Sequence, residues 1–264
     1  MKIAAVQMIS GPEVGSNLVT AGRLIAEAAA AGASLVALPE YFPLIGATDA
    51  DRLTAREVDG AGPIQDFLAT TARRHGIWLI GGSIPLLAQD PDKLRNSCLV
   101  FDPQGKRVAR YDKIHLFGFR KGDEAYDEAA TIERGDQVES FDSPLGRIGL
   151  AICYDLRFPE LFRAMGELDL LVLPAAFTET TGRAHWEILL RARAVENQCY
   201  VLAAAQGGRH PNGRMTHGNS MVIDPWGEVL ARMEKGEGVV LAELDPQRLV
   251  ETRSSLPALK HRIL

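Results

Sequence analysis

The sequence predicts an α/β protein, arranged as a four-layer αββα sandwich of two similar halves. Short apolar runs alternate with segments of helical periodicity, which indicates sheets covered by helices. The same order of elements then returns in the second half of the chain, with local sequence matches. Because helices cover one face of each sheet, the two remaining sheet faces are expected to pack against each other.

The first half of the chain alternates strand-like and helical segments. Three apolar runs have the length and composition of buried strands: 2–8, 34–40 and 77–84. Helical periodicity is found in two segments between them: 16–32 and 63–76. Ser16 occupies the N-cap position of the first helix, and Gly32 lies just beyond its end. Pro63 and Gly76 mark the beginning and end of the second helix.

The second half repeats this order. Its strand-like runs are 147–153, 168–175 and 199–205, and its helical segments are 157–165 and 183–198. "SLVALPE" resembles "DLLVLPA", and "NSCLVFDPQGKRVAR" (96–110) resembles "NSMVIDPWGEVLAR" (219–232). Both of the longer segments predict hairpins around an Asp-Pro-x-Gly turn. The segment 113–136 lacks clear periodicity, and a loop of that length inside a compact domain is usually functional.

Composition narrows the class of protein. The chain has 264 residues and a net charge of −5 with both signs interspersed, so nothing favours a nucleic-acid or anionic-membrane partner. No shift in composition marks a linker, which predicts one domain over residues 1–264. The apolar runs are too short to span a bilayer. Three widely spaced cysteines form no zinc-binding pattern, and they indicate a reduced, cytoplasmic protein.

Cys153 is the candidate nucleophile. It lies in "GLAICYDLRFPELFR" (149–163), between a predicted strand and the following helix. An isolated cysteine in an apolar run is usually a core residue. At this junction, however, backbone N–H groups of the turn and the helix N-terminus favour a thiolate and can hold an oxyanion. Cys98 and Cys199 lack this context and are predicted to be structural.

A thiol nucleophile needs a proton acceptor. None of the six histidines lies in a pattern typical of cysteine proteases, so they are expected to be mostly structural or on the surface. Glu40 ends the apolar run 34–40, where it is either a solvated loop residue or a positioned base, since α/β sheets gather reactive groups at strand ends. Lys113 begins the long segment 113–136, and taken alone it fits an ordinary surface lysine.

Three motifs together resemble the nitrilase, or carbon–nitrogen hydrolase, superfamily: "LPEYF" (38–42), "RYDKIHLF" (110–117) and "GLAICYDLRFPEL" (149–161). The resemblance extends over essentially the whole chain and implies the nitrilase-like αββα fold. It also implies a Glu-Lys-Cys triad at Glu40, Lys113 and Cys153. A second glutamate of the family matches Glu128, within "YDEAATIERGD" (126–136).

The resemblance implies a cysteine-dependent amidase that needs no metal and no organic cofactor. Cys153 would attack a carboxamide carbon and form a thioester, while Glu40 transfers protons and then activates water. Lys113 and the backbone N–H of Tyr154 would face the developing oxyanion. Glu128 would hold Lys113 and help to position the substrate.

The second half resembles the branch that contains deaminated glutathione amidase, over residues 175–206 and 217–231. This implies hydrolysis of a small amide, deaminated glutathione, whose 2-oxoglutarate acyl group is released from cysteinylglycine. Two alternatives of the same class stay open: an ω-amidase acting on 2-oxoglutaramate, and a true nitrilase. A Cys-His hydrolase and an inert nitrilase-like binding protein are the alternatives from other classes.

Such an acyl group carries a free carboxylate, which arginine binds through two parallel hydrogen bonds. Arg157 follows Cys153 by about one helical turn and is the first candidate for this contact. Its alternative role is a salt bridge with Glu160 or Asp155 that fixes the turn.

Arg183 is the second candidate for binding the carboxylate, and the loop 207–216 is a further place to seek it. Phe177 and Thr178 are expected to line the acyl chain, beside Tyr154. These assignments follow from position relative to Cys153 and from the branch resemblance.

Members of the family commonly pair through helices, so a homodimer or a higher even oligomer is expected. The helix 183–198 carries a set of apolar residues suited to a core face: Trp186, Leu189, Leu190 and Val195. It also carries charged residues suited to pairing across a two-fold axis: Arg191, Arg193 and Glu196. A solvated charged face would account for the same charges.

Overall fold

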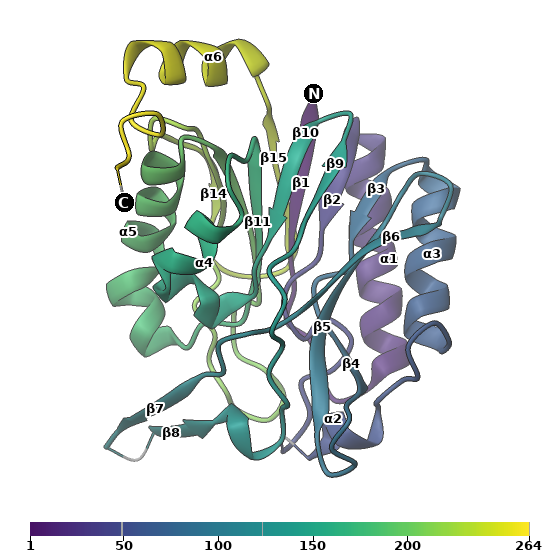
Figure 1. Ribbon diagram of the computed structural model, residues 1–264. Helices are drawn as coiled ribbons and strands as arrows, with labels where there is room; N and C mark the ends of the chain where they lie inside the picture. Colours follow the sequence, from purple (N-terminus) through teal and green to yellow (C-terminus); the bar gives the residue numbers. More distant parts are fainter. Residues whose placement is uncertain (49, 123, 264) are drawn as a thin grey trace.

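The computed structural model describes residues 1–48, 50–122 and 124–263, which form two packed sheets between layers of helices (Figure 1). The helices are α1 (Val14–Ala30), α2 (Asp51–Thr54), α3 (Pro63–His75), α4 (Pro159–Ala164), α5 (Glu179–Asn197) and α6 (Pro246–Ser255). Two short 3-10 helices are η1 (Glu128–Ala130) and η2 (Cys153–Arg157).

The strands fall into two large sheets and one hairpin. The first sheet has the order β15-β1-β2-β3-β5-β4, with β6 paired to β5. Its strands are β1 (Lys2–Gln7), β2 (Ala33–Ala37), β3 (Trp78–Ile80), β4 (Ile84–Leu87), β5 (Leu94–Phe101), β6 (Arg107–Asp112) and β15 (Gly238–Glu243). The second sheet has the order β14-β13-β12-β11-β10-β9. Its strands are β9 (Ser140–Ser143), β10 (Gly146–Leu150), β11 (Leu170–Ala175), β12 (Tyr200–Ala205), β13 (Ser220–Ile223) and β14 (Val229–Met233). The hairpin joins β7 (Gly118–Lys121) to β8 (Glu124–Asp127).

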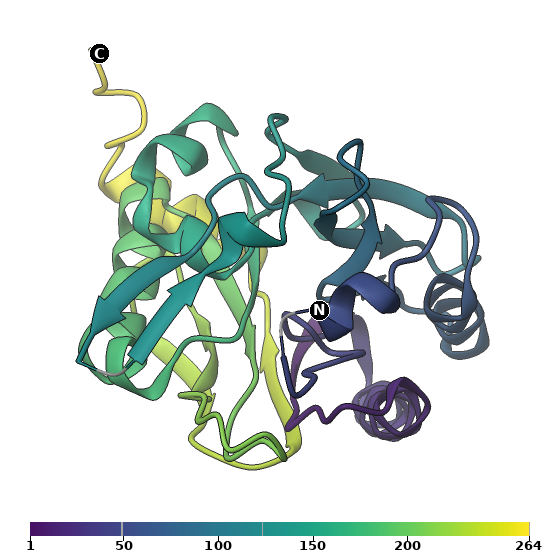
Figure 2. The ribbon, with the colours of Figure 1, turned by 90° about the horizontal axis from the view of Figure 1, so that it is seen from below.

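Burial along β1 shows how the layers form. Ile3 and Ala5 pack into the core between the two sheets, together with residues of β10, β11 and β12. Ala4 and Val6 point the other way and pack against α1 and α3. Successive residues of a strand face opposite sides of its sheet. The four-layer sandwich is therefore confirmed, with α1 and α3 on one outer face and α4 and α5 on the other (Figure 2).

The internal repeat is visible in two matching hairpin turns. At the β5–β6 turn, Asp102 Oδ1 accepts hydrogen bonds from the backbone N–H groups of Gln104 and Lys106, each at 2.9 Å. At the β13–β14 turn, Asp224 Oδ1 accepts from Trp226 at 2.9 Å and from Glu228 at 2.7 Å. The Asp-Pro-x-Gly motif thus forms the same turn in both halves, as the sequence predicts.

Several predicted boundaries shift for local reasons. α1 begins two residues before Ser16, with Glu13 as its N-cap residue. The run 77–84 is interrupted after β3, because Gly82 has φ +56° and its Cα lies against the carbonyl oxygen of Pro39, where a Cβ would sit 2.1 Å from that oxygen. α5 begins earlier than 183, because the Thr178 side chain accepts a hydrogen bond from the backbone N–H of Thr181.

The faces of α5 differ in part from the sequence prediction. Trp186 and Leu190 are fully buried, as expected, but Val195 is 48% exposed and does not belong to the core face. Arg193 is buried, with Nε donating to the Leu156 carbonyl at 3.0 Å, so its expected role in pairing across a two-fold axis is wrong. The exposed face instead carries Ile188 and Val195, which lie two turns apart on the same side of the helix.

No helix in the described part of the chain is long and apolar enough to cross a membrane.

Candidate active site

The central strands of each sheet run parallel, and their carboxyl ends meet at one edge of the sandwich. Glu40 follows β2 at this edge, and Ala176 follows β11. Cys153 begins η2, just after β10 ends at Leu150. The strand ends therefore bring the predicted nucleophile and the predicted base to the same place.

Cys153 sits at a sharp elbow. Its φ of +50° lies in the left-handed region, which side chains other than glycine seldom adopt. Asp155 fixes this elbow, because its Oδ2 accepts a hydrogen bond from the backbone N–H of Ile152 at 2.8 Å. The reversal of the chain turns the Cys153 side chain out of the sheet and into a cavity.

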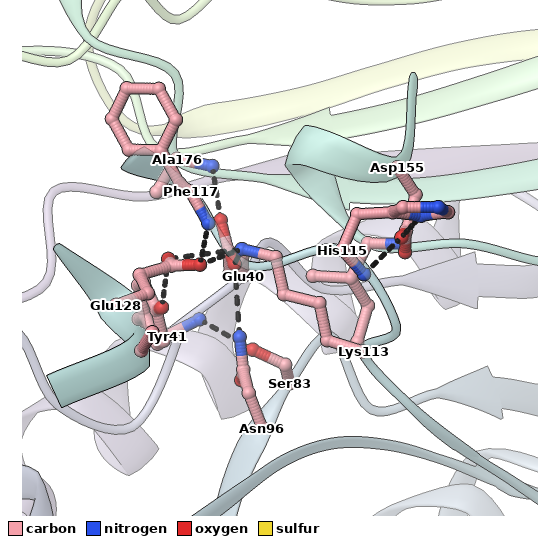
Figure 3. Close-up of polar contacts among 12 residues, drawn as sticks. Glu40, Tyr41, Ser83, Asn96, Lys113, His115, Phe117, Glu128, Asp155 and Ala176 are labelled. Carbon is pink, nitrogen blue, oxygen red and sulfur yellow. Dashed lines mark hydrogen bonds and ion pairs between the residues drawn. The ribbon is translucent and has the colours of Figure 1, made fainter. Parts of the chain in front are cut away.

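Asp155 also ties the elbow to the segment that carries Lys113. Its carboxylate accepts hydrogen bonds from the Tyr111 hydroxyl at 2.8 Å and from the backbone N–H of His115 at 3.0 Å. His115 Nδ1 lies 2.7 Å from Asp155 Oδ1, and Figure 3 shows this pair. From the sequence, Asp155 is expected only as a partner of Arg157. The signal for its role is its place in the first turn after a strand, where acidic side chains bind free N–H groups.

Glu40 is fully buried and its carboxylate is held from three directions (Figure 3). Oε1 accepts from Lys113 Nζ at 2.9 Å and from Asn96 Nδ2 at 3.0 Å. Oε2 accepts from the backbone N–H of Ala176 at 2.9 Å. The carboxylate is therefore fixed in orientation, and its two oxygens are bound by groups from different sheets.

Glu128 binds Lys113 from the other side, as Figure 3 shows. Lys113 Nζ lies 3.0 Å from Glu128 Oε1 and 2.8 Å from Oε2. The Tyr41 hydroxyl donates to Oε1 and the backbone N–H of Phe117 donates to Oε2, both at 2.7 Å. Lys113, taken alone, fitted a surface position; instead it is completely buried between two carboxylates.

These contacts set the protonation of the group. Burial lowers the pKa of Lys113, but Glu128 and Glu40 outweigh it and raise that pKa well above 10.5. Burial raises the pKa of Glu128, but the Lys113 ammonium and hydrogen bonds outweigh it and hold that pKa below 4.5. The cluster thus holds the Lys113 ammonium against the Glu128 carboxylate.

The same surroundings keep Cys153 protonated in the resting protein. Burial and the nearby Glu40 carboxylate raise the pKa of the thiol well above 9, against the opposing effects of Lys113 and of the Ala176 N–H. The sequence predicts a turn that favours the thiolate; the pKa of the thiol is raised instead, because burial, with the charge of the nearby carboxylates, outweighs the groups that lower it. A thiol that is protonated at rest can act as a nucleophile only if a base takes its proton.

Cys153 opens into a small cavity with an empty volume of about 280 Å³. Its lining includes Glu40, Glu128, Tyr154, Arg157, Phe177 and Thr178. Lys113 lies behind Glu40 and Glu128 and does not line the cavity. No histidine of the described ranges lines it. A fixed carboxylate and a thiol at one small cavity, with a buried ammonium behind the carboxylate, form an arrangement suited to covalent catalysis on a carbonyl carbon.

A family model for the carbon–nitrogen hydrolases matches residues 2–254. The chain belongs to the carbon–nitrogen hydrolase family. The deaminated glutathione amidase of Synechocystis is 42% identical over 98% of this chain and 97% of its own length. Omega-amidase NIT2-A of Xenopus laevis is 40% identical over 99% of this chain and 94% of its own.

Solved structures agree with this assignment. The crystal structure of Saccharomyces cerevisiae Nit3, described as a member of branch 10 of the nitrilase superfamily, has a TM-score of 0.89 and 32% identity. The match covers all of this chain and 97% of Nit3. The protein is therefore a hydrolase of carbon–nitrogen bonds other than peptide bonds, and its fold is that of the nitrilase superfamily.

The two arginines named from the sequence occupy different places in this carbon–nitrogen hydrolase. Arg157 lines the Cys153 cavity, with its guanidinium carbon 5.3 Å from the Phe177 ring centroid and 5.6 Å from that of Tyr154. Its Nη1 lies 3.1 Å from Nδ1 of His185. Neither Glu160 nor Asp155 forms the expected salt bridge with it.

Arg183 lies away from the cavity of the hydrolase. Its side chain is 79% exposed and pairs with Glu179 at 3.0 Å, one turn earlier on α5. A third arginine, Arg214, does line the cavity, and it belongs to the loop 207–216. That loop has no periodicity or motif that singles out one residue, so only the three-dimensional arrangement identifies Arg214.

Proposed function

We propose that residues 1–264 form a single catalytic domain that hydrolyses deaminated glutathione to 2-oxoglutarate and cysteinylglycine. The observation that carries the proposal is the Glu40–Lys113–Glu128 cluster, which borders the same small cavity as the Cys153 thiol. The names of the similar amidases support the choice of substrate.

In the first half of the reaction, Cys153 Sγ attacks the amide carbon and its proton passes to Glu40. The carbonyl oxygen gains negative charge, which the Lys113 ammonium and the backbone N–H of Tyr154 stabilise. The C–N bond then breaks, and Glu40 gives its proton to the departing nitrogen. Cysteinylglycine leaves, and 2-oxoglutarate stays attached to Cys153 as a thioester.

In the second half, Glu40 takes a proton from water, and the resulting nucleophile attacks the thioester carbon. The C–S bond breaks, the proton returns to Cys153, and free 2-oxoglutarate leaves. One carboxylate acts as acid and base in turn, which explains why Glu40 is held by Ala176, Asn96 and Lys113 in a fixed position. Glu128 keeps Lys113 in place through both steps.

Arg157 suits the free carboxylate of the acyl group. It stands in η2, the 3-10 helix that begins at Cys153, and it lines the cavity beside Phe177 and Thr178. No carboxylate of the described residues forms an ion pair with it, so its fork of N–H groups can bind an incoming anion.

Mass spectrometry of the intact chain during turnover tests the chemistry. An adduct with the mass of a 2-oxoglutarate acyl group on Cys153 supports the proposal, and its absence during active turnover rejects the thioester. Arg157→Met is expected to raise KM for 2-oxoglutaramate far more than for a short uncharged amide. An equal rise for both substrates would assign Arg157 a structural role.

An ω-amidase is the second candidate, because NIT2-A is 40% identical to this chain. Comparing kcat/KM for deaminated glutathione and for 2-oxoglutaramate decides between the two. A nitrile matched to each amide tests nitrilase activity, through the release of acid from the nitrile.

We further propose that the hydrolase forms a homodimer, or a higher even oligomer, through the outer face of α5. This face carries the exposed side chains of Ile188 (68%) and Val195 (48%), and Trp226 (56%) of the β13–β14 turn lies exposed next to it. Together with Arg191 they border a broad surface hollow. Light scattering is expected to give a multiple of twice 28.7 kDa, and a 28.7 kDa particle at micromolar concentration would reject the dimer.

The compartment is proposed from the cysteines. Cys98, Cys153 and Cys199 are all free and buried, as expected of a protein that works in the reducing cytoplasm.

A further inference from the structure

Arg214 is a cation at the Cys153 cavity that the reaction described above does not use. It lines the cavity, and its guanidinium carbon lies 5.0 Å from the centroid of the Tyr126 ring. Nη2 donates only a long hydrogen bond of 3.4 Å to the carbonyl oxygen of Ala176. Nε is buried and has no hydrogen-bond partner within the described ranges. A buried N–H without an acceptor is costly, and a bound ligand would satisfy it.

The charge of Arg214 is also uncompensated. Among residues 1–48, 50–122 and 124–263, no carboxylate lies within 4 Å of its guanidinium nitrogens. Arg232 and Arg253, by contrast, each pair with a carboxylate at 3.0–3.2 Å. An arginine that faces a cavity without a protein anion is suited to a planar anion such as a carboxylate.

Arg214 borders two spaces at once. Besides the Cys153 cavity, it lines a second cavity with an empty volume of about 630 Å³, which is also bordered by Tyr41, Thr48 and Asn212. Arg157, Tyr154 and Phe177 do not line this second cavity. The two arginines therefore occupy different parts of the wall, and the larger space begins at Arg214.

The proposed substrate has a carboxylate on each side of the bond that breaks. One belongs to the 2-oxoglutarate acyl group, which stays bound to Cys153 in the small cavity during the thioester stage. The other belongs to the glycine of the departing cysteinylglycine, which is larger and must leave after the first half of the reaction. The small cavity, with an empty volume of about 280 Å³, has less than half the empty volume of the space beyond Arg214, at about 630 Å³. The dipeptide therefore needs the adjoining space.

We propose that Arg214 is a specificity-determining residue that binds the carboxylate of the leaving amine, while Arg157 binds that of the acyl group. This inference rests on the proposed function and adds to it a subsite for an anionic leaving group. This subsite would distinguish two amides that have the same acyl group. The cysteinylglycine amide contacts both arginines, whereas 2-oxoglutaramate, which releases ammonia, contacts only Arg157.

The test compares deaminated glutathione with its C-terminal carboxamide, in which only the leaving-group carboxylate is neutralised. Arg214→Met keeps the length and the apolar stem of the side chain and removes its charge. We expect the variant to lower the ratio of kcat/KM between the two substrates by about 10- to 100-fold, the scale of a lost charged hydrogen bond. Arg214→Lys keeps the charge without the planar fork, and an intermediate ratio is expected.

Arg209→Met is the matched control, because Arg209 lies in the same loop, is exposed and does not line either cavity. It is expected to leave the ratio unchanged. A ratio that stays at the wild-type value in both Arg214 variants would overturn the inference while the proposed function stands. If the wild-type protein cleaves neither substrate, the proposed function fails, and the leaving-group subsite fails with it.

Discussion

Two strand ends occupy matching positions in the two halves of the molecule and have different roles. β2 leads into Pro39 and Glu40, and β11 ends with Pro174 and Ala175. The first strand end carries a carboxylate. The second has only small side chains, but the backbone N–H of the next residue, Ala176, binds that carboxylate at 2.9 Å. The sequence repeat brings both strand ends to the same edge, where one copy supplies a carboxylate and the other supplies the backbone N–H that binds it.

The difference extends to the whole site. The first half contributes the charged cluster of Glu40 and Lys113, and the second half contributes the thiol and most of the wall around it. A repeat therefore predicts where strand ends meet, because that depends on the backbone. It does not predict which of the two strand ends has a charged side chain. That depends on single residues, and both positions lie equally close to the edge of the sandwich.

The largest effect is expected from removing the thiol in the second half. Cys153→Ala should abolish turnover, because no thioester can form; loss of a nucleophile can cost about 10⁶-fold. The fold should survive, since only the sulfur is lost. Steady-state assays and a thermal melt measure both results. Cys98→Ala, at a buried cysteine in β5 away from the cavity, should stay active. Normal turnover by Cys153→Ala would refute the nucleophile.

Glu40→Gln tests the carboxylate at the first strand end. The amide cannot take the thiol proton, and its NH₂ group would face the N–H of Ala176, so kcat should fall by about 10²- to 10⁴-fold. Rapid-quench measurement of thioester formation shows whether the loss of kcat arises in the acylation step. Glu160→Gln, at an exposed position on α4, serves as the control and should be active. Wild-type acylation by Glu40→Gln would require a different base.

Lys113→Ala tests the cation between the carboxylates. We expect kcat to fall by at least about 10²-fold, the effect of losing one oxyanion donor. Two buried carboxylates would also lose their counter-ion, which costs about 3–5 kcal/mol of unfolding free energy. Denaturant titration and kinetics measure the two effects. Lys106→Ala, exposed in the β5–β6 turn, is the control. A loss in kcat below tenfold would exclude Lys113 from oxyanion stabilisation.

The smallest effect concerns pH. The pKa of Glu128 is held below 4.5 in the folded protein, so its stabilising contribution is present above that value and is lost as pH falls through the folded pKa. Glu128→Gln lacks this contribution. The difference in unfolding free energy between wild type and Glu128→Gln should therefore shrink as pH falls from 7 to below 4.5. Urea titrations at several pH values check this, and a difference that does not change with pH would contradict the coupling to Lys113.

The layers of the fold were predictable because they depend on periodicity that is local in the sequence. β1 shows this, since its successive residues Ile3 and Ala4 lie in different cores. Ile3 belongs to the core between the sheets, and Ala4 belongs to the core under α1 and α3. The boundary errors arise where one residue overrides the pattern. Gly82 stops a strand through a close contact with Pro39, which is 43 positions away in the chain and leaves no local signal.

The site was partly predictable for a related reason. Glu40 and Cys153 stand at ends of predicted strands, so their meeting follows from the topology. The left-handed φ of Cys153 and the anchoring of its turn by Asp155 depend on Tyr111 and on the His115 backbone, which come from another sheet and the loop after it. The sequence does not single out Arg214, because what distinguishes it is the lack of an ion-pair partner among the described residues, which a sequence does not display.

The contact between Glu40 and Ala176 also bears on how the protein folds. Its partners are 136 positions apart, and those of the Gln206 hydrogen bond to the Glu40 carbonyl are 166 apart. Contacts this distant in sequence carry a large loop-closure cost and form slowly. During refolding, each sheet has local hairpins to nucleate on, whereas the hydrolytic site exists only after the two sheets have docked. The return of enzymatic activity should therefore lag behind the return of secondary structure and report the last stage of assembly.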